Sequence, residues 1–352
     1  MGAERGDEPR SRPTLRDVGR LAGVTGATAS YVLNGRADGQ VSAETSARVL
    51  RAAAELGYRP NSAARALRTR RHRIVGLVLG EVHHNPPPIW AMAGAHDEAR
   101  ARGHSLLVTN AIGTRAGLRR AFDELLDRQV DSIVVAVSGT RAVPVPTPID
   151  GTPVVLVNCF PTPDGVPCVL PEEEAGGRAA ADFVLAQGHR RVALLAGVAS
   201  LWATQARVRG YRSALACAGL PDDDGLVRYG TYRMASGYHL AREVLGGSPP
   251  PTALLCGNDR MALGAYVAVA EAGLRIPDDV SVMGYDDEPE LASEAVPALS
   301  TVRLPYEAMG QWAVRQLLSG AYDTLPPRTL IPCEVVPRDS VAPPTRVQTA
   351  TR

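Results

Sequence analysis

The chain has 352 residues, enough for two or three domains, and its 45% hydrophobic and 21% charged residues are typical of a soluble globular protein. The net charge of +1 hides a division, because residues 1–73 hold 14 arginines and 7 acidic residues whereas the rest of the chain holds 24 arginines and 30 acidic residues, so a polyanionic partner is indicated for the N-terminal part only. No apolar run approaches the length of a membrane-spanning helix and the charged N-terminus lacks the apolar segment of a secretory signal, which predicts a cytoplasmic protein with no membrane partner.

The N-terminal part opens with residues 1–13, which are charged and contain proline and are predicted to form a disordered tail. Thr14 is then placed to cap a short helix that ends near Gly23. The next stretch, VTGATASYVLNGR (residues 24–36), could be a loop or a second helix, since its small and β-branched residues have low helix propensity. Two helices and a turn of this size predict a helix-turn-helix, and the alternative is an ordinary helical hairpin.

A third helix is predicted from Ser42, whose hydroxyl can cap it, to Gly57, a residue type that commonly ends helices. Val49 and Leu50 are among the residues whose spacing places them on the inward face of this helix. Residues 14–60 are thus expected to form one small all-α domain. The arginine-rich segment that follows, residues 61–72, would on its own be interpreted as a solvated basic linker.

From Arg73 the pattern changes, because short apolar runs alternate with longer amphipathic ones. One series begins with IVGLVLGEV and a similar series follows Pro171, and each predicts a parallel sheet with helices on both faces. Residues 73–340 are therefore expected to form two doubly wound α/β subdomains with a ligand cleft near the carboxyl ends of their strands. Residues 341–352, which are rich in proline and arginine, are predicted to be a loose tail.

The sequence does not favour an enzyme or a metal centre. It contains no phosphate-binding GxxxxGK[ST] loop, no GxSxG motif and no HExxH motif, so no catalytic residue and no cofactor are expected. The five cysteines match no zinc-binding spacing and are interpreted as reduced packing residues. His83 and His84 could ligate a metal, but adjacent side chains point in different directions and no acidic partner is evident. A polar loop is therefore preferred, and no metal is expected.

Several segments together resemble the LacI/GalR family of bacterial transcription regulators over residues 14–338: TLRDVGRLAGVTGATASYVLNGR, LAQGHRRVALLAG, RVRGYRSAL, CGNDRMALGAYVAVAEAGLRIPDDVSVMGYDD and PALSTVR. The resemblance implies a homodimeric repressor with a DNA-binding headpiece, a hinge helix and a periplasmic-binding-protein-like body that senses a small molecule. The implied partners are a pseudo-palindromic double-stranded operator in the nucleoid and a carbohydrate or related polyol. The implied N-subdomain covers about residues 73–165 and 300–325, and the C-subdomain about 166–299 and 326–340.

In the headpiece the resemblance implies that the second helix enters the major groove. Gly26 and Ala27 would face the base edges, where neither can make a bidentate hydrogen bond. Tyr31 is therefore expected to carry direct readout, with packing on the backbone as the alternative. Thr25 would cap this helix and touch a phosphate, and Asn34 would contact another phosphate. The full set of expected headpiece contacts to DNA is Thr14, Thr25, Gly26, Ala27, Thr28, Ser30, Tyr31 and Asn34.

In the hinge the resemblance implies a helix that forms on the operator and enters the minor groove. Leu67 would wedge between the central base pairs and kink the duplex. Ala64 would let the two hinge helices of the dimer approach closely, and Arg68 would serve the anionic groove wall. The hinge residues expected to contact DNA are Asn61, Ala64, Leu67 and Arg68.

In the body the resemblance implies an effector pocket. Arg207 matches a pocket arginine whose planar fork suits vicinal hydroxyls or a carboxylate. Asn258 and Asp286 match polar contacts at two strand ends, and Tyr232 matches an aromatic residue that stacks on the ligand. The alternatives are a structural ion pair between Arg207 and Asp286 and structural roles for Tyr232 and Asn85. The full set of expected effector contacts is Asn85, Trp90, Arg207, Tyr232, Asn258 and Asp286.

Two departures from the family pattern concern the effector. Pro171 and Glu172 stand where many relatives have an Asp-Asn pair, which puts the usual contact there in question. The stretch NPPPIW (residues 85–90) replaces a commoner aromatic pair, although Trp90 offers a nearby ring. Both departures indicate an effector that differs from a typical monosaccharide. Two other classes compete: a transport ligand-binding protein, expected to carry a signal peptide and no basic headpiece, and a nucleotide-dependent α/β enzyme, expected to have a glycine loop after its first strand.

Overall fold

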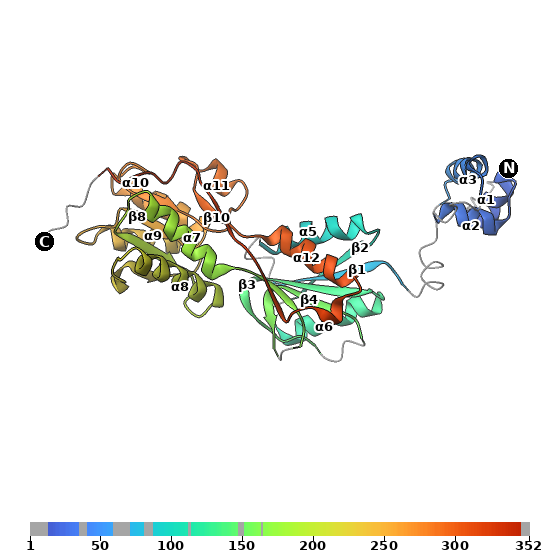
Figure 1. Cartoon of the computed structure of the whole chain (residues 1–352), viewed down its shortest axis with the longest axis horizontal. Coiled ribbons are helices and arrows are strands. Elements are labelled where there is room, and N and C mark those ends of the chain that lie inside the picture. Colours follow the sequence, from blue (N-terminus) through green and yellow to red (C-terminus); the bar gives the residue numbers. More distant parts are fainter. Residues whose placement is uncertain are drawn as a thin grey trace, which may run out of the picture. The chain divides into compact units, whose positions relative to one another are not determined.

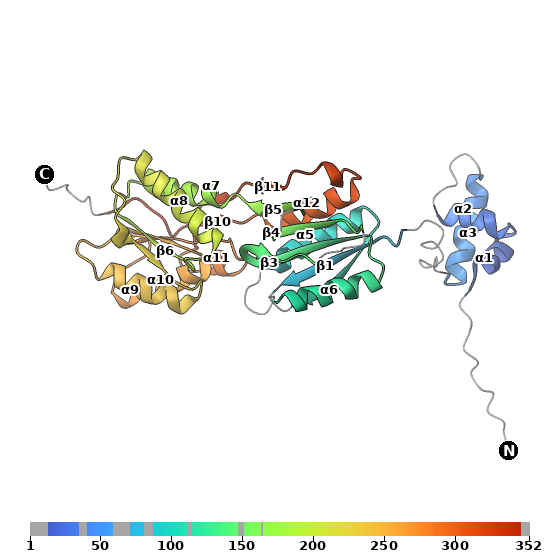
Figure 2. The same cartoon turned by 90° about the horizontal axis from the view of Figure 1, so that it is seen from below.

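The computed structural model describes residues 13–34, 41–58, 71–80, 87–111, 114–146, 151–162 and 165–345. The chain forms two compact units, residues 1–72 and 73–352, each of which is described by itself (Figures 1 and 2). Several residues singled out in the sequence lie outside the described part: Asn61, Ala64, Leu67, Arg68, His83, His84 and Asn85. The stretch expected to be an N-terminal tail also lies outside it, apart from its last residue.

Unit 1 contains three short helices, α1 (Leu15–Ala22), α2 (Gly26–Leu33) and α3 (Ala43–Glu55). Their inward faces share one small apolar core, made of Val18, Ala22, Ala29, Val32, Val49, Ala52 and Ala53. The stretch after Gly23 is thus helical in spite of its low propensity, because packing against α1 and α3 stabilises it. Leu50, which the spacing placed inward, is instead 55% exposed, since its neighbours on α3 occupy the core-facing positions.

Hydroxyl side chains define where these helices begin. The Thr14 side chain accepts the backbone N–H of Asp17, whose carboxylate accepts the N–H of Thr14 in return, so the two residues form a capping box. The Thr25 hydroxyl accepts the N–H of Thr28 at 3.1 Å, and Ser42 caps α3 in the same way. These bonds satisfy backbone donors that the helices leave unpaired at their first turns.

Unit 2 begins with a lobe built on a six-stranded parallel sheet in the order β11-β5-β4-β3-β1-β2. Its strands are β1 (Ile74–Gly80), β2 (Ser105–Ala111), β3 (Ser132–Val143), β4 (Val154–Pro161), β5 (Cys168–Pro171) and β11 (Arg328–Ile331). Helices α5 (Pro87–Ala101) and α12 (Tyr306–Leu318) pack together on one face, and α6 (Arg115–Asp127) covers the other (Figure 2). Both faces of this sheet are therefore buried.

The second lobe has a four-stranded parallel sheet in the order β7-β6-β8-β9. Its strands are β6 (Val192–Ala196), β7 (Val227–Tyr229), β8 (Ala253–Cys256) and β9 (Ser281–Met283). Helices α7 (Glu173–Ala186) and α8 (Trp202–Cys217) pack together, as do α9 (Met234–Leu245) and α10 (Asp259–Glu271). The four helices begin at the carboxyl-end edge of the sheet, so their N-termini gather on the side that faces the first lobe (Figure 1).

The lobes are joined where the chain crosses after β5, after β10 (Thr301–Arg303) and after β11. β10 pairs antiparallel with β12 (Glu334–Val336) between the two sheets; the short elements η1 (Asp224–Leu226), α11 (Leu291–Glu294) and η2 (Tyr322–Thr324) complete the fold. β5 and β11 lie in the sheet of the first lobe, whereas residues 166–171 and 326–331 are implied by the family resemblance to belong to the C-subdomain. The reason is pairing, because β5 extends the sheet from β4 and β11 extends it from β5.

The first part of the predicted C-terminal tail, residues 341–345, is not loose but bonded to the second lobe. The carbonyl of Ala342 bonds to the ring Nε2 of His189 at 2.9 Å, and the Thr345 hydroxyl donates to the carbonyl of Asp278 at 2.6 Å. His189 is only 1% exposed, and its other ring nitrogen bonds to the Thr252 hydroxyl at 2.9 Å. Residues 341–345 therefore belong to the second lobe. None of the helices in the described part of the chain has both the length and the apolar character that a bilayer crossing requires.

Candidate functional site

The α2 helix of unit 1 presents two side chains to solvent one turn apart. Ala27 is exposed, and Tyr31, four residues on, is 48% exposed. Ala29 and Val32 point to the opposite side, into the core. Tyr31 belongs neither to the apolar core of unit 1 nor to the residues packed against it, so its ring lies on the outer surface of α2.

The residues of unit 1 that are expected to lie near DNA phosphates already form hydrogen bonds within the protein. The Asn34 side-chain amide donates to the Ser30 carbonyl at 2.7 Å and to the Ser30 hydroxyl at 3.1 Å. The hydroxyls of Thr25 and Thr28 lie 2.9 Å apart, and Thr14 is engaged in its capping box. These hydrogen bonds fix the directions of the side chains. A DNA phosphate that binds there would share their hydroxyl and amide groups with the bonds already present.

Gly26 has no packing reason to be a glycine. A Cβ atom at this position would meet nothing closer than the Leu15 carbonyl oxygen, 3.9 Å away. A Cβ atom on Gly19 would instead lie 2.9 Å from the Val24 carbonyl oxygen, where α1 crosses the turn. The missing side chain at Gly26 therefore changes only the outer surface of α2, which would allow the backbone to approach another molecule closely.

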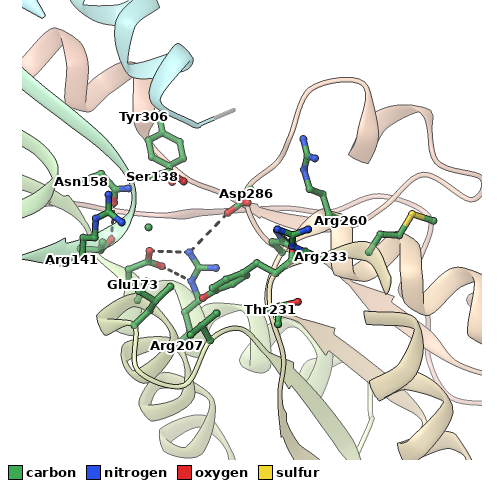
Figure 3. A pocket seen from close by; sticks show the side chains of 18 of the residues that line it. Ser138, Arg141, Asn158, Glu173, Arg207, Thr231, Arg233, Arg260, Asp286 and Tyr306 are labelled. Carbon is green, nitrogen blue, oxygen red and sulfur yellow. Dashed lines mark hydrogen bonds and ion pairs between the residues drawn. The ribbon is translucent and has the colours of Figure 1, made fainter. Parts of the chain in front are cut away.

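In unit 2 a cavity of about 730 Å³ lies at the carboxyl-end edges of the two sheets (Figure 3). Residues 138–141 and Asn158 line it from the first lobe, and the N-terminal ends of α7, α8, α9 and α10 line it from the second. Four of the residues expected to contact an effector lie in this cavity: Arg207, Tyr232, Asn258 and Asp286.

Arg207 on α8 is buried and its main partner is Glu173, the first residue of α7. Its Nε and one Nη donate to the two carboxylate oxygens of Glu173 at 2.7 and 2.9 Å, and the other Nη donates to the Gly257 carbonyl at 2.6 Å. The guanidinium also stacks on the Tyr285 ring, 3.7 Å from its centroid. Each Nη keeps one further N–H group that a ligand can use, because these three bonds use the single hydrogen of Nε and one of the two on each Nη.

Asp286 lies opposite, with a carboxylate oxygen 4.0 Å from Arg207 (Figure 3). This is too long for a hydrogen bond but still an ion pair, so Arg207 is paired closely with Glu173 and more distantly with Asp286. Asp286 is 8% exposed, and its carboxylate accepts no hydrogen bond from the described residues. Burial raises the pKa of this carboxyl well above its usual range, and the charge on Arg207 opposes the shift only in part. The group can thus accept a hydrogen bond from a ligand hydroxyl or, when protonated, donate one.

The backbone at Asp286 is strained. Its φ angle is +115°, a value that residues other than glycine rarely adopt. Two hydrogen bonds hold this conformation, from the N–H of Asp286 to the Val302 carbonyl at 2.8 Å and from the N–H of Leu304 to the Asp286 carbonyl at 3.3 Å. The crossing strand β10 thus fixes the direction of the Asp286 side chain, and strain of this kind is often stored at binding sites.

Tyr232 and Asn258 support each other. The Asn258 side chain accepts the N–H of Met261 at 2.9 Å, which caps α10, and donates to the Tyr232 carbonyl at 3.1 Å. The Tyr232 hydroxyl lies 2.6 Å from that of Thr204, and its ring covers Gly197, where any side chain would collide with it. Burial raises the pKa of the Tyr232 hydroxyl. Both residues therefore have structural bonds in addition to their place in the cavity.

Trp90 does not line the cavity. Its ring centroid lies 6.0 Å from that of Tyr306, and it is Tyr306 that reaches the cavity from α12. Glu173 was also missed, although it directly follows the questioned pair Pro171 and Glu172. Neither residue of that pair lines the cavity, because β5 buries Pro171 and the chain turns into α7 at Glu172.

Arg141, Asn158 and Arg233 also line the cavity and were not singled out from the sequence. The only signal for them is their position at strand ends or helix starts. The described residues contain no group of His, Cys, Asp and Glu side chains arranged to hold a metal ion.

Comparison with known proteins gives matches over both units. The sequence pattern of the family described as "Bacterial regulatory proteins, lacI family" matches residues 14–61, and that of the "Periplasmic binding protein-like domain" matches residues 181–341. The chain is 36% identical to the HTH-type transcriptional regulator CelR of Thermobifida fusca, over 95% of this chain and 99% of that protein.

Two solved structures are similar to the present one. A complex of the transcriptional regulator CelR with cellobiose has 32% sequence identity and a TM-score of 0.65, and the lac repressor dimer bound to operator and the anti-inducer ONPF has 28% identity and a TM-score of 0.73. The match covers 94% of this chain and 100% of the other chain in both cases.

Proposed function

Since this chain belongs to the LacI family of bacterial regulatory proteins, it is a DNA-binding transcription regulator and not an enzyme, and we propose that it is a repressor controlled by a hydroxylated small molecule bound in the cavity of unit 2. In this proposal residues 14–60 form the headpiece, 61–72 the hinge and 73–340 the effector-binding body. The protein acts as a homodimer on a pseudo-palindromic operator, in the cytoplasm and at the nucleoid.

The observation that carries the effector proposal is the carboxylate of Asp286. It is buried, it accepts no hydrogen bond from the described residues, and one of its oxygens lies 4.0 Å from Arg207 on the cavity wall. Its carboxylate lines the cavity and can accept hydrogen bonds in addition to its ion pair with Arg207, so a hydroxylated ligand can supply these bonds. A carboxylate opposite a guanidinium suits neighbouring hydroxyl groups, and the rings of Tyr232 and Tyr306 suit the apolar face of a sugar. CelR, one relative of this chain, has been solved with cellobiose.

The DNA proposal rests on the exposed face of α2. Ala27 offers only apolar contact, for example with a thymine methyl, so Tyr31 carries most of the direct readout. Thr25 and Asn34 position the helix on phosphates. Leu67 from each subunit inserts at the centre of the operator and bends it. The lac repressor, a relative, has been solved as a dimer bound to its operator.

The two sites are coupled through the lobes of unit 2. The cavity is lined from both lobes, so a ligand that contacts Asn158 on one side and Arg207 on the other favours one angle between them. A change in this angle at the dimer face would weaken or strengthen the paired hinge segments, and through them operator affinity. Such coupling is reciprocal, because operator DNA must change effector affinity by the same factor.

The operator proposal is tested by a gel-shift titration of the full chain on DNA from upstream of its own gene. We expect a specific complex that weakens steeply as salt rises, since phosphate contacts release counterions. Binding no tighter than to random DNA of equal length would contradict the proposal. Replacing Leu67 by alanine should cut operator affinity at least tenfold and leave effector binding intact.

The effector proposal is tested by thermal shift with a panel of sugars, sugar acids and nucleosides, since a ligand that binds only the folded state raises Tm. Any shift should largely disappear in Asp286→Asn, which keeps the shape but loses the charge. Asp182→Asn is the matched control, because Asp182 lies on the outer face of α7 and pairs with Arg178 at the surface. Equal shifts in both variants would show that Asp286 does not bind the effector.

A further inference from the structure

The cavity of unit 2 contains more positive than negative charge. Four arginines line it, Arg141, Arg207, Arg233 and Arg260, against two carboxylates, Glu173 and Asp286. Arg207 is neutralised by Glu173, and Arg260 makes two hydrogen bonds to Glu288. Arg233 is exposed and has no ion pair with any residue that the structure describes. A cation therefore remains at the cavity wall without an internal counter-charge.

The start of α9 adds to this positive potential. Arg233 is the N-cap residue and its side chain does not cap the helix, and the first turn of α9 contains no acidic residue. Met234 and Ala235 line the cavity, and their backbone N–H groups find no acceptor in the described part of the chain. Unpaired N–H groups at the start of a twelve-residue helix form a favourable place for an anion.

Of the other helices that begin at the cavity, α8 also has no side-chain cap and no acidic residue in its first turn, but no arginine stands at its N-cap, and α7 and α10 differ further. α7 carries two acidic residues in its first turn, and α10 begins with the Asn258 cap followed by Asp259. The partial positive charge at the N-termini of α7 and α10 is thus already compensated by side chains of the protein. The start of α9 with Arg233 is the part of the cavity wall where a helix dipole and an arginine charge are both left without compensation.

Two further groups on the cavity wall indicate what else the ligand carries. Asp286 and the Nη groups of Arg207 can bind ligand hydroxyls. From these two observations we propose that the effector is an anionic sugar-like molecule, whose hydroxyls bind at Arg207 and Asp286 and whose carboxylate or phosphate binds at Arg233 and the start of α9. This inference rests on the proposed function of the cavity and names the chemical class of its ligand.

The anionic group would also act on the angle between the lobes. Arg141 belongs to the first lobe and Arg233 to the second, and Figure 3 shows them on different sides of the cavity. An anion bound at Arg233 attracts Arg141 across the cavity and so favours closure. A neutral sugar of the same shape lacks this attraction, so the charge on the ligand is part of the signal.

The first experiment uses inorganic phosphate as the probe, with the full-length protein and chloride at equal ionic strength as the reference. We expect phosphate to raise Tm in a saturable manner, and Arg233→Gln to raise its apparent Kd about tenfold. Arg209→Gln is the matched control, because Arg209 lies on α8 and pairs with Glu174 at the surface. No saturable shift beyond chloride, or the same Kd in Arg233→Gln and wild type, would overturn the proposal.

The second experiment separates the two sources of the anion. Glucose, glucuronate and glucose 6-phosphate share one ring and differ in charge, and cellobiose and cellobionate form a second pair. Titration calorimetry of each should show an acid or phosphate ester binding at least tenfold more tightly than its neutral parent, and this advantage should vanish in Arg233→Gln. Neutral parents that bind as tightly as their charged forms would overturn the proposal. The charged form that binds most tightly identifies the anionic group as a carboxylate or a phosphate.

These outcomes are independent of the operator test, which is performed without ligand. A protein that binds its operator and a neutral sugar, yet ignores the charge of the ligand, would retain the proposed function and lose this inference. A protein that fails to bind any operator would lose the proposed function, and the phosphate titration would still decide whether the anion site exists.

Discussion

Replacing Glu173 by glutamine is expected to destabilise unit 2 far more than an ordinary surface substitution on the same helix. Glu173 is 2% exposed and receives two hydrogen bonds from Arg207, at 2.7 and 2.9 Å. Glutamine has nearly the same shape but no charge, and it keeps only one oxygen that can accept. Arg207 would then be a buried cation with Asp286 at 4.0 Å as its nearest negative group.

The magnitude follows from the burial of the pair. Removing one member of a buried ion pair costs about 3–5 kcal/mol, because the other charge is left without its partner. One of the two bonds survives in glutamine, so we expect a loss of about 2–4 kcal/mol in the free energy of unfolding. Screening by solvent does not reduce this value, since both side chains are buried. In a unit of this size the melting temperature should fall by roughly 5–10 °C.

The assay is urea unfolding followed by circular dichroism, with Glu174→Gln as the control. Glu174 is the next residue of α7 and pairs with Arg209 at 2.8 Å, but both side chains are more than half exposed. Its loss should cost no more than about 1 kcal/mol. A third variant, Glu173→Leu with Arg207→Met, removes both charges and should be more stable than Glu173→Gln, because no buried charge remains unpaired.

Two results would refute this reasoning. If Glu173→Gln were no less stable than Glu174→Gln, the buried fork would contribute nothing beyond a surface pair. If the doubly substituted variant were as unstable as Glu173→Gln, the loss would come from packing at this position and not from an isolated charge.

Two further predictions concern other parts of the chain. Gly26→Ala should leave the headpiece as stable as before or stabilise it by up to about 1 kcal/mol, but it should weaken operator binding because the added methyl group holds α2 away from the bases. Gly19→Ala should instead destabilise the headpiece by about 1–3 kcal/mol, because its Cβ atom collides with the Val24 carbonyl. Melting curves and gel shifts measure both effects, and unchanged operator affinity in Gly26→Ala would contradict a close approach of α2 to the bases. Burial lowers the pKa of His189, and its bond to Ala342 opposes this effect only weakly, so the folded state binds the proton less readily than the unfolded chain and the free energy of unfolding should fall as pH drops below about 6.5. Urea unfolding at pH 5.5 and 7.5 should show a smaller pH dependence in His189→Gln than in the wild type. An equal pH dependence in both proteins would exclude His189 as its source.

Much of the architecture could be predicted because it depends on local patterns. Alternation of buried runs with amphipathic ones marks the two parallel sheets, and hydroxyl residues such as Thr14 and Ser42 mark helix starts. Arg207 and Asp286 were singled out by the resemblance of their segments to the LacI/GalR family, and both line the cavity. What these positions do not give is the partner of each side chain.

The site residues that were missed depend on contacts that no local pattern contains. Three glutamates follow Pro171, and only the rotation of α7 about its axis decides that Glu173 is the one that meets Arg207. Trp90 offered a ring close in sequence to the expected pocket, but Tyr306, more than two hundred positions away, occupies that place because α12 packs on α5. Tertiary packing settles both cases.

The pairing of β11 with β5 has a consequence for the order in which the protein can be made. Most of the first lobe has been synthesised by residue 171, but its edge strand β11 and the covering helix α12 come only after the whole second lobe. Until residues 306–331 have left the ribosome, one face of the first sheet lacks α12 and β5 remains an open edge. A chain interrupted within the second lobe therefore carries a complete headpiece on an unfinished body, and a headpiece of this kind has no effector control.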